Sequence, residues 1–276
     1  MRSQTDLHGS YLFLAWLLIV SSWRTWLWRQ RLKHRQCDTN MTESTHTRMK
    51  HTLLFIRHGQ TSWNVEHRLP GQLPGIALND TGREQAARLA EALSVLPIST
   101  IVTSPLERAY DTASLLNRER NLPLHLDPDL MDTNIGHWAG QSYHELNKID
   151  ETWKSFIHNP TVAPEDVETF PQVQNRAVAA VERWRKRESS GLFIAFVAHA
   201  DVVKLLVAHY SGLDTRRAGS IMIDNASVSI VELEEEHPPR VVSIGWNPKP
   251  GWLKAPTPAE AKEGAQHTAE KLDKVP

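Results

Sequence analysis

Short apolar runs alternate with amphipathic stretches from residue 52 onward. Apolar runs that predict buried strands occupy 53–56, 100–103, 124–126, 192–197, 228–233 and 241–246. Between them, apolar residues recur at helical spacing, which predicts helices over 79–96, 142–149, 151–158, 171–187 and 201–210, with another that begins near 104. Strands that alternate with helices are typical of an α/β domain.

Local signals predict how two of these helices begin. Ser104, Pro105 and Glu107 have the pattern of a capping box, with Ser104 as the N-cap residue. Asp201 follows the strand at 192–197 and is expected to cap the next helix.

The two ends of the chain differ in composition from this domain. Residues 1–50 form an N-terminal extension whose apolar run, 11–20, is shorter than the roughly 20 residues that span a bilayer. An unstructured extension, or a translation start placed upstream of Met49, is the favoured interpretation. A membrane anchor through 11–28 and a cleaved signal remain alternatives. Residues 51–248 would be the folded domain, and 249–276 a mobile tail.

Charge and cysteine content narrow the function classes. The 276-residue chain has a formal net charge of −1, which gives no global field for a nucleic-acid partner. The charge is uneven, because residues 1–50 hold eight Lys or Arg and three Asp or Glu. Cys37 is the only cysteine, so an internal disulfide is impossible, and a reducing, cytoplasmic location is expected.

Charged and ionisable side chains stand where several predicted strands end or helices begin. Arg57 and His58 directly follow the first strand, and His199 closely follows the strand at 192–197. Arg108 opens a helix, and Asp132 precedes a loop. Strand ends on one side of an open sheet converge on one crevice, and two guanidinium groups there would match phosphate oxygens. The pattern therefore favours an anion site.

Phosphoryl transfer through a histidine would give each of these residues a role. His58 is the candidate nucleophile, and Arg57, Arg108 and protonated His199 are the candidate cations, with Asn64 as a neutral donor. Asp132 would protonate the leaving oxygen and then activate water, although Asp129 competes for this role. Each residue also has an ordinary explanation, since a single strand-end arginine or histidine is usually structural or solvated.

Four motifs carry a resemblance to a known family. Arg-His-Gly-Gln-Thr-Ser-Trp-Asn runs from Arg57 to Asn64, and Ser-Pro-Leu-Glu-Arg-Ala-Tyr-Asp-Thr runs from Ser104 to Thr112. The other two are the segment 130–140 and Val-Ala-His-Ala-Asp at 197–201. Together they resemble the histidine phosphatase superfamily, also called phosphoglycerate mutase-like, over about 52–247. The resemblance implies a three-layer α/β/α sandwich with a mostly parallel sheet of about six strands.

The resemblance also implies an activity and a site. It suggests a metal-independent phosphomonoester hydrolase without a cofactor, acting on a small phosphorylated metabolite through a phosphohistidine. Arg108 would grip the phosphate and Gly71 would approach the substrate. Asp132 stands where the family most often has Glu, and Ala200 where it usually has Gly. The phosphate- or substrate-binding set would be Arg57, Gln60, Thr61, Asn64, Gly71, Arg108, His199 and Ala200.

Other functions remain as alternatives. Phosphoglycerate mutases of this type carry a longer insertion between the acid segment and the second histidine, so the short stretch here favours the phosphatase branch. A non-catalytic phosphate-binding or scaffold protein is a second alternative. A metal-dependent hydrolase is a third, because His199 and Asp201 could ligate a cation, although the chain has no His-Glu-x-x-His motif. Substrate identity and oligomeric state are not readable from these patterns.

Overall fold

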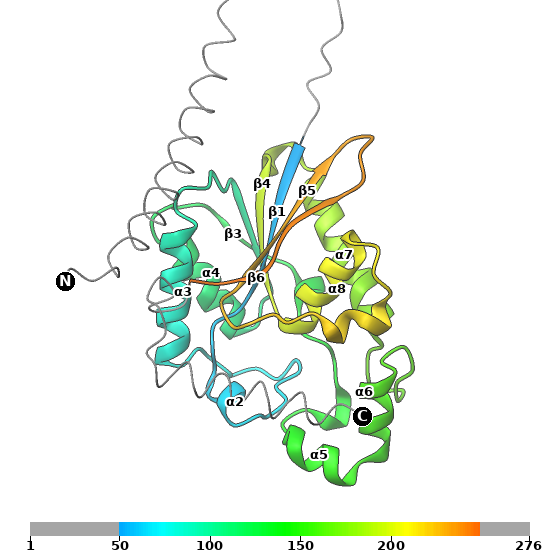
Figure 1. The fold of residues 1–276 in the computed structure, drawn as a ribbon. Helices are drawn as coiled ribbons and strands as arrows, with labels where there is room; N and C mark the ends of the chain where they lie inside the picture. Colours follow the sequence, from blue (N-terminus) through cyan, green and yellow to red (C-terminus); the bar gives the residue numbers. More distant parts are fainter. Residues whose placement is uncertain (1–49, 249–276) are drawn as a thin grey trace, which may run out of the picture. The chain divides into compact units, whose positions relative to one another are not determined.

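The computed structural model describes residues 50–248, which form a six-stranded sheet in the order β3-β2-β4-β1-β5-β6 (Figure 1). The strands are β1 (Lys50–Arg57), β2 (Thr100–Thr103), β3 (Leu124–Leu126), β4 (Phe193–Ala198), β5 (Val228–Glu234) and β6 (Arg240–Trp246). The first four pair in parallel, whereas β5 is antiparallel to β1 and β6 is antiparallel to β5. The predicted mostly parallel α/β sheet is confirmed.

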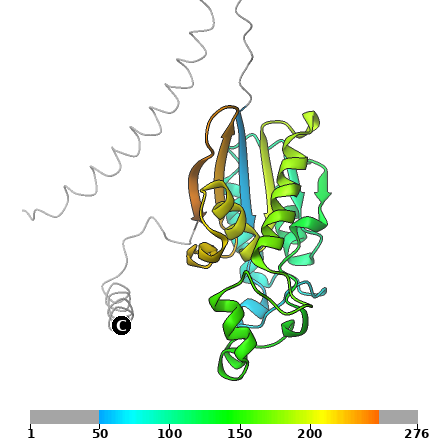
Figure 2. The ribbon, with the colours of Figure 1, turned by 90° about the vertical axis from the view of Figure 1, so that its right-hand side faces the viewer.

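Helices cover both faces of the sheet (Figures 1 and 2). The helices α3 (Asp80–Ala92) and α4 (Glu107–Asn117) pack with Leu54 and Ile56 of β1 in one apolar cluster. On the other face, α7 (Phe170–Arg185) and α8 (Ala200–Tyr210) pack with Leu53 and Phe55. Consecutive strand residues point to opposite faces, so this alternation explains why β1 is apolar throughout. The expected three-layer sandwich is confirmed.

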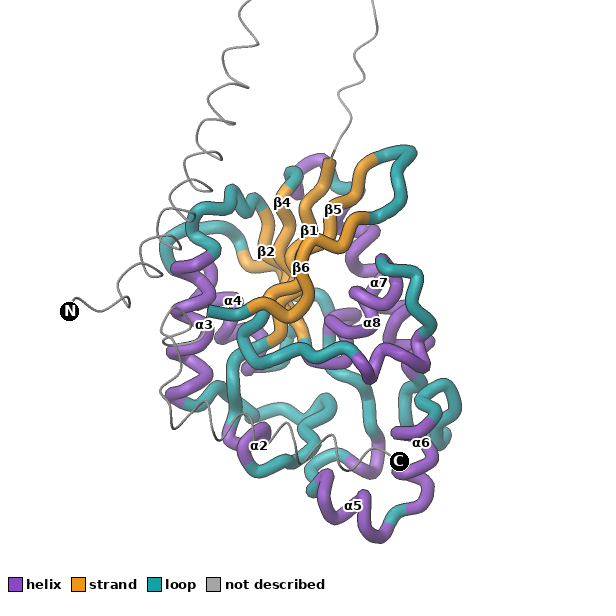
Figure 3. Tube along the Cα trace, viewed as in Figure 1, coloured by secondary structure: helices purple, strands orange, loops and turns teal. Residues whose placement is uncertain are grey.

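Shorter helices lie beyond the end of β1. These are α2 (Ser62–Val65), α5 (Tyr143–Ile149) and α6 (Glu151–His158), and loops gather around them (Figure 3). Buried aromatic side chains fill this region, with the Trp138 ring 5.0 Å from the Trp153 ring and 5.4 Å from the Phe156 ring. Single-turn 3₁₀ helices occur at Pro128–Leu130, Gly136–Trp138 and Glu188–Ser190, and a longer one at Thr215–Ser220.

Three predicted helix ends are corrected. The helix expected over 79–96 ends at Ala92, although Asn79 caps it as expected. Ser104 does not cap α4, whose N-cap position is Leu106; the Ser104 hydroxyl accepts the Leu106 N–H at 3.3 Å and lies 2.9 Å from His199 Nε2. Asp201 lies in the first turn of α8 and His199 holds the N-cap position. Helix α4 thus begins at Glu107 and α8 at Ala200.

The ends of the chain lie almost wholly outside the described residues. The predictions for 1–50, which include the anchor at 11–28, and for 249–276 therefore stay predictions. Within 50–248, every helix is too short or too polar to cross a membrane.

Candidate active site

His58 is held by its backbone at the end of β1. Its N–H donates to the carbonyl oxygen of Ala198 at 3.0 Å, which continues the parallel pairing of β1 with β4. Its own carbonyl accepts hydrogen bonds from the Ala226 N–H at 3.0 Å and the Asn225 side chain at 3.2 Å. Three anchors from two other segments fix the position from which the imidazole extends.

Gly59 brings the next turn against the start of α3. A methyl group at Gly59 would collide with the carbonyl oxygen of Gly82, and one at Gly82 would collide with the carbonyl oxygen of Gln60. The Gly59 N–H donates to the Thr112 hydroxyl at 3.0 Å. Two glycines thus permit a backbone contact that no larger residue would allow.

The contacts and burial of the His58 ring favour one neutral tautomer. Its Nδ1 lies 2.6 Å from the carbonyl oxygen of Gly59, and since a carbonyl can only accept, Nδ1 carries the proton. The lone pair is therefore on Nε2. Burial lowers the pKa of His58 well below its usual value, and the neighbouring His199, Arg57 and Arg108 lower it further. The ring is neutral at pH 7, as a phosphoryl acceptor requires.

His199 lies beside His58, with the two ring centroids 5.3 Å apart. Its Nε2 is 2.9 Å from the Ser104 hydroxyl, which also accepts the Leu106 N–H at 3.3 Å. The Asp132 carboxylate oxygen 3.6 Å from Nδ1 favours the tautomer with the proton on Nδ1, so the Ser104 hydroxyl donates to Nε2. Nδ1 is buried and has no hydrogen-bond partner within the described residues.

The protein groups around His199 disfavour a positive charge on the ring, and the charge predicted for the phosphate-bound site stays a prediction. Burial lowers its pKa well below the usual value, and Arg108, Arg176 and Arg57 add to the shift. The ring is therefore neutral at pH 7 in this structure. It can still donate a hydrogen bond through Nδ1–H.

Two arginines complete the cationic part of the site, Arg108 fully buried and Arg57 partly buried. Arg57 donates through one terminal nitrogen to the Ile223 carbonyl at 2.6 Å, and Arg108 donates to the Gly71 carbonyl at 2.7 Å. Arg57 Nε, Arg108 Nε and Arg108 Nη1 are buried without a partner in the part of the chain that the structure describes. Buried donors are nearly always satisfied, so these three and His199 Nδ1 indicate an acceptor-rich ligand.

Asp132 joins this group from the loop after β3. One carboxylate oxygen lies 3.1 Å from Arg108 Nη2 and 3.6 Å from His199 Nδ1. The competing carboxylate of Asp129 instead pairs with Arg183 at 2.9 Å, and Arg183 also pairs with Asp127 at 2.8 Å. The geometry places Asp132, and not Asp129, beside the two arginines and histidines.

Three residues of the first motif have structural contacts. Thr61 caps α2, since its hydroxyl accepts the Asn64 N–H at 3.2 Å and its N–H donates to Asn64 Oδ1 at 3.0 Å. Asn64 Oδ1 also accepts a hydrogen bond from Asn225 at 3.2 Å. An amide oxygen can only accept, so the side-chain amide nitrogen of Asn64 is the atom that could donate to phosphate. Gln60 Oε1 accepts from Asn79 at 3.0 Å at the start of α3. Their phosphate-binding roles stay predictions.

The last two predicted binding residues contact the site differently. The carbonyl oxygen of Gly71 accepts a hydrogen bond from the Arg108 side chain. The φ of Gly71 is +48°, in the left-handed region that glycine adopts readily. Ala200 is the first residue of α8, directly after His199. A helix N-terminus favours an anion, which agrees with the predicted role of Ala200.

Sequence reasoning missed several residues that hold the site together. Ser104 sets the His199 tautomer, Asn225 bridges the His58 carbonyl and Asn64, and Thr112 receives the Gly59 N–H. Ser104 and Thr112 were inside a recognised motif, whereas Asn225 belongs to none. Its place is seen only in the structure, where the neighbouring Ala226 adopts a positive φ of 47° before β5.

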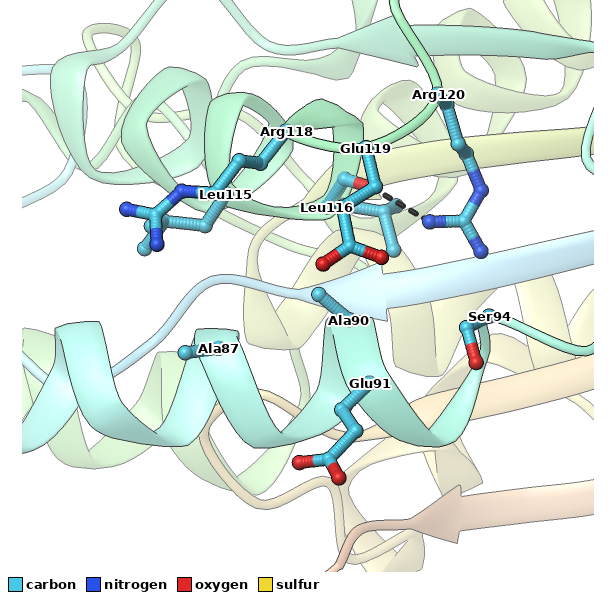
Figure 4. A pocket seen from close by; sticks show the side chains of 9 residues that line it. All are labelled: Ala87, Ala90, Glu91, Ser94, Leu115, Leu116, Arg118, Glu119 and Arg120. Carbon is cyan, nitrogen blue, oxygen red and sulfur yellow. Dashed lines mark hydrogen bonds between the residues drawn. The ribbon is translucent and has the colours of Figure 1, made fainter.

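Asp201, which the metal-dependent alternative groups with His199, has a partner in its own helix. The Asp201 carboxylate pairs with Lys204 at 3.2 Å. Among the described residues, no three His, Cys, Asp or Glu side chains are grouped to hold a metal ion. A separate pocket of about 350 Å³ lies between α3 and α4, lined in part by Glu91, Arg118 and Arg120 (Figure 4). None of the predicted site residues lines it.

Comparison with known proteins establishes the family. The model of the histidine phosphatase superfamily (branch 1) matches residues 53–247, so the chain belongs to this superfamily. Phosphoglycerate mutase-like protein 4 of Arabidopsis thaliana is 33% identical over 186 residues, covering 66% of this chain and 79% of that protein. Phosphoserine phosphatase 1 of Hydrogenobacter thermophilus is 29% identical over 185 residues, covering 66% of this chain and 87% of that protein.

A solved structure extends the comparison to the fold. Mycobacterial glucosyl-3-phosphoglycerate phosphatase, in complex with VO3, is similar to this chain with a TM-score of 0.63 and 28% identity. The similarity covers 72% of this chain and 100% of that one. Relatives named as phosphatases therefore occur in both the sequence and the structure comparisons.

Proposed function

We propose that this protein is a phosphomonoester hydrolase that acts through a phosphohistidine on His58. The observation that carries the proposal is the set of four buried, unpartnered N–H donors around a neutral histidine whose Nε2 holds a lone pair. A phosphate monoester supplies the oxygen acceptors that these donors lack. Family membership and the phosphatases among the relatives support the same activity.

The first half of the reaction transfers the phosphoryl group to the enzyme. His58 Nε2 attacks phosphorus, an N–P bond forms, and the bond from phosphorus to the ester oxygen breaks. Arg57, Arg108 and the Nδ1–H of His199 would stabilise the non-bridging oxygens as charge redistributes. Asp132 gives its proton to the leaving oxygen, so the product departs as an alcohol.

The second half regenerates the enzyme. Asp132, now ionised, takes a proton from a water molecule as that water attacks the phosphohistidine. The N–P bond breaks, the electron pair returns to His58 Nε2, and inorganic phosphate leaves. The Asp132 proton is thereby restored, and one water is consumed per ester hydrolysed.

Trapping of the phosphoenzyme tests this mechanism. The protein is mixed with p-nitrophenyl phosphate, quenched in alkali and weighed by mass spectrometry, with acid lability of the added phosphoryl group as the signature. Wild type should carry the group, and His58→Ala should not, with a loss of hydrolysis of more than about 10³-fold. His158→Ala, which removes an exposed histidine at the end of α6, should behave as wild type.

A substrate panel separates the remaining alternatives. It should include phosphoserine, sugar phosphates, 3-phosphoglycerate and nucleotides, with phosphoglycerate mutase activity assayed in parallel. We expect hydrolysis of a small phosphorylated metabolite to exceed mutase turnover. Mutase turnover that exceeds hydrolysis would favour the mutase alternative. A wild-type protein that is neither labelled nor active on any ester would contradict the enzyme proposal and favour a phosphate-binding scaffold. The cytoplasmic location stays a prediction.

A further inference from the structure

The loop that carries Asp132 has little regular structure of its own. It follows β3 through the single turn Pro128–Leu130, and Asp132 lies two residues beyond that turn. Aspartate has one methylene fewer than the glutamate usual in the family. Its reach therefore depends more on the backbone beneath it, and a general acid needs hydrogen-bond distance to the atom that it protonates.

One arginine from α7 binds the backbone of this loop. Arg176 Nη1 donates to the carbonyl oxygens of Asp129 at 2.8 Å and Met131 at 2.7 Å, and Nη2 donates to that of Asp132 at 2.8 Å. A second donor, Gln72 Nε2, reaches the Asp132 carbonyl at 2.8 Å. The planar fork of arginine suits such a set of contacts, which one lysine ammonium could not reproduce in the same geometry.

Glu168 in turn orients Arg176 and binds the far side of the loop. Its carboxylate oxygens lie 2.8 Å from Arg176 Nε and 2.9 Å from Nη2. The same carboxylate accepts the Asn134 N–H at 2.7 Å, and the Glu168 N–H donates to the Asn134 carbonyl at 2.8 Å. Arg176 and Glu168 together thus make hydrogen bonds to the backbone of residues that precede Asp132, of Asp132 itself and of a residue that follows it. Both side chains are mostly buried, with 16% and 23% of their surface exposed.

We propose that Arg176, held by Glu168, is a positioning residue that sets the reach of Asp132 for proton transfer to the leaving oxygen. The inference rests on the proposed function, because it assumes that Asp132 is the acid. Arg176 makes no hydrogen bond to the phosphate-binding nitrogen atoms among the described contacts. Besides its charge, which lowers the pKa of His199, it acts through three carbonyl groups of the Asp132 loop. Misplacement of a catalytic group by about 1 Å can cost about 10²-fold in rate.

Leaving-group dependence distinguishes positioning from general stabilisation. An alkyl phosphate such as phosphoserine expels a strongly basic alkoxide and needs the acid, whereas p-nitrophenyl phosphate expels a weakly basic phenolate and needs it little. The measurement is the single-turnover rate of phosphoenzyme formation on each ester, which isolates the step that the acid assists. Asp132→Asn is the reference for complete loss of the acid.

The test variants are Arg176→Met, Arg176→Lys and Glu168→Gln. Arg176→Met should slow transfer from phosphoserine by about 10²-fold and from p-nitrophenyl phosphate by less than about threefold. Arg176→Lys keeps the charge but not the fork, and should show the same selectivity with a smaller loss. Should Arg176→Met not fold, Arg176→Lys and Glu168→Gln give the same selectivity test.

Arg183→Met is the matched control. Arg183 also belongs to α7 and forms ion pairs with Asp127 and Asp129, which precede Asp132 in the chain. Unlike Arg176, it contacts their side-chain carboxylates and not the backbone carbonyl groups of the loop. Its removal should change the two rates equally and by less than about threefold. The Arg183→Met variant therefore measures how much the transfer rates change when an ion pair near the loop is lost.

The outcomes separate this inference from the function on which it rests. Selective loss on phosphoserine in both Asp132→Asn and the Arg176 variants supports it. Selective loss in Asp132→Asn alone, with equal or no loss in the Arg176 variants, overturns the positioning role and leaves the acid in place. An Asp132→Asn variant without leaving-group selectivity overturns Asp132 as the acid, and the positioning role with it.

Discussion

At the scale of single residues, the two histidines differ in which nitrogen carries the proton. His58 donates a hydrogen bond from Nδ1–H to the Gly59 carbonyl and keeps a lone pair on Nε2, whereas His199 accepts a hydrogen bond at Nε2 and keeps N–H at Nδ1. Both rings are neutral, because burial among arginines disfavours a further positive charge. One ring is thereby suited to attack phosphorus and the other to donate to its oxygens.

Ser104→Ala should reduce the preference of His199 for the tautomer with its proton on Nδ1. Without the hydroxyl, His199 loses the donor that fixes its tautomer, and the Leu106 N–H loses its acceptor. We expect kcat/KM to fall about tenfold, the equivalent of about 1.4 kcal/mol, and inhibition by vanadate to weaken. Nitrogen NMR shifts of the His199 ring should show a mixed tautomer.

Ser114→Ala is the control for this substitution, since Ser114 is also on α4 and bonds only the Tyr110 carbonyl, at 2.9 Å, among the described contacts. It should keep wild-type kinetics. A Ser104→Ala enzyme with wild-type kinetics and an unchanged tautomer would contradict the assigned role of Ser104.

At the scale of elements, the first motif depends on how closely the turn after β1 approaches α3. Gly59 and Gly82 allow the two backbones to meet, while Gln60 and Asn79 join them by a side-chain bond of 3.0 Å. The glycine of this motif is thus required by helix packing. Its φ is not in the positive region that glycine often serves.

Gly59→Ala should therefore damage both stability and activity. The added methyl group meets backbone atoms of α3, which can yield only if the turn or the helix moves. We expect a loss of about 1–3 kcal/mol in the free energy of unfolding, typical of overpacking, together with lower kcat from a displaced His58. Urea denaturation and steady-state kinetics measure the two effects.

Gly219→Ala is the comparison, because a methyl group there meets nothing within 4 Å and the backbone φ is not positive. Its free energy of unfolding should stay within about 0.5 kcal/mol of wild type. If Gly59→Ala is equally neutral, the packing explanation for this glycine is wrong.

At the scale of the whole molecule, the neutral buried histidines link stability to pH. The pKa values of His58 and His199 are lowered in the folded protein, so over the range below about 6.5 the unfolded chain binds more protons than the folded one. The free energy of unfolding should consequently fall as pH is lowered from about 6.5 toward the folded-state pKa values. Above about 6.5 these groups should contribute no slope.

Urea unfolding between pH 7.5 and 5.5 checks this expectation. The double variant His58→Gln/His199→Gln should show a shallower pH dependence than wild type. His51, whose pKa is also lowered by burial and by Arg185, is left in place and retains part of the slope. Equal slopes in wild type and the double variant would contradict the linkage.

Much of the architecture was predictable because it depends on local patterns. Apolar runs gave all six strands to within three residues, and the helices over 143–149 and 151–158 matched closely. Helix beginnings were less predictable where a polar residue had two possible partners. Ser104 had the local pattern of a cap, yet its hydroxyl binds a histidine that is 95 positions away in the chain.

The sequence by itself determined the fold class, the family resemblance, and the identities of His58, Arg57, Arg108, Asp132 and His199 as candidates. It could do so because strand periodicity and motif order are properties of neighbouring residues. Only the tertiary structure decided the proton positions on the two rings, the neutrality of His199, the choice of Asp132 over Asp129, and the contacts of Arg176. Those properties depend on burial and on groups brought together from distant segments, and the linear pattern records neither.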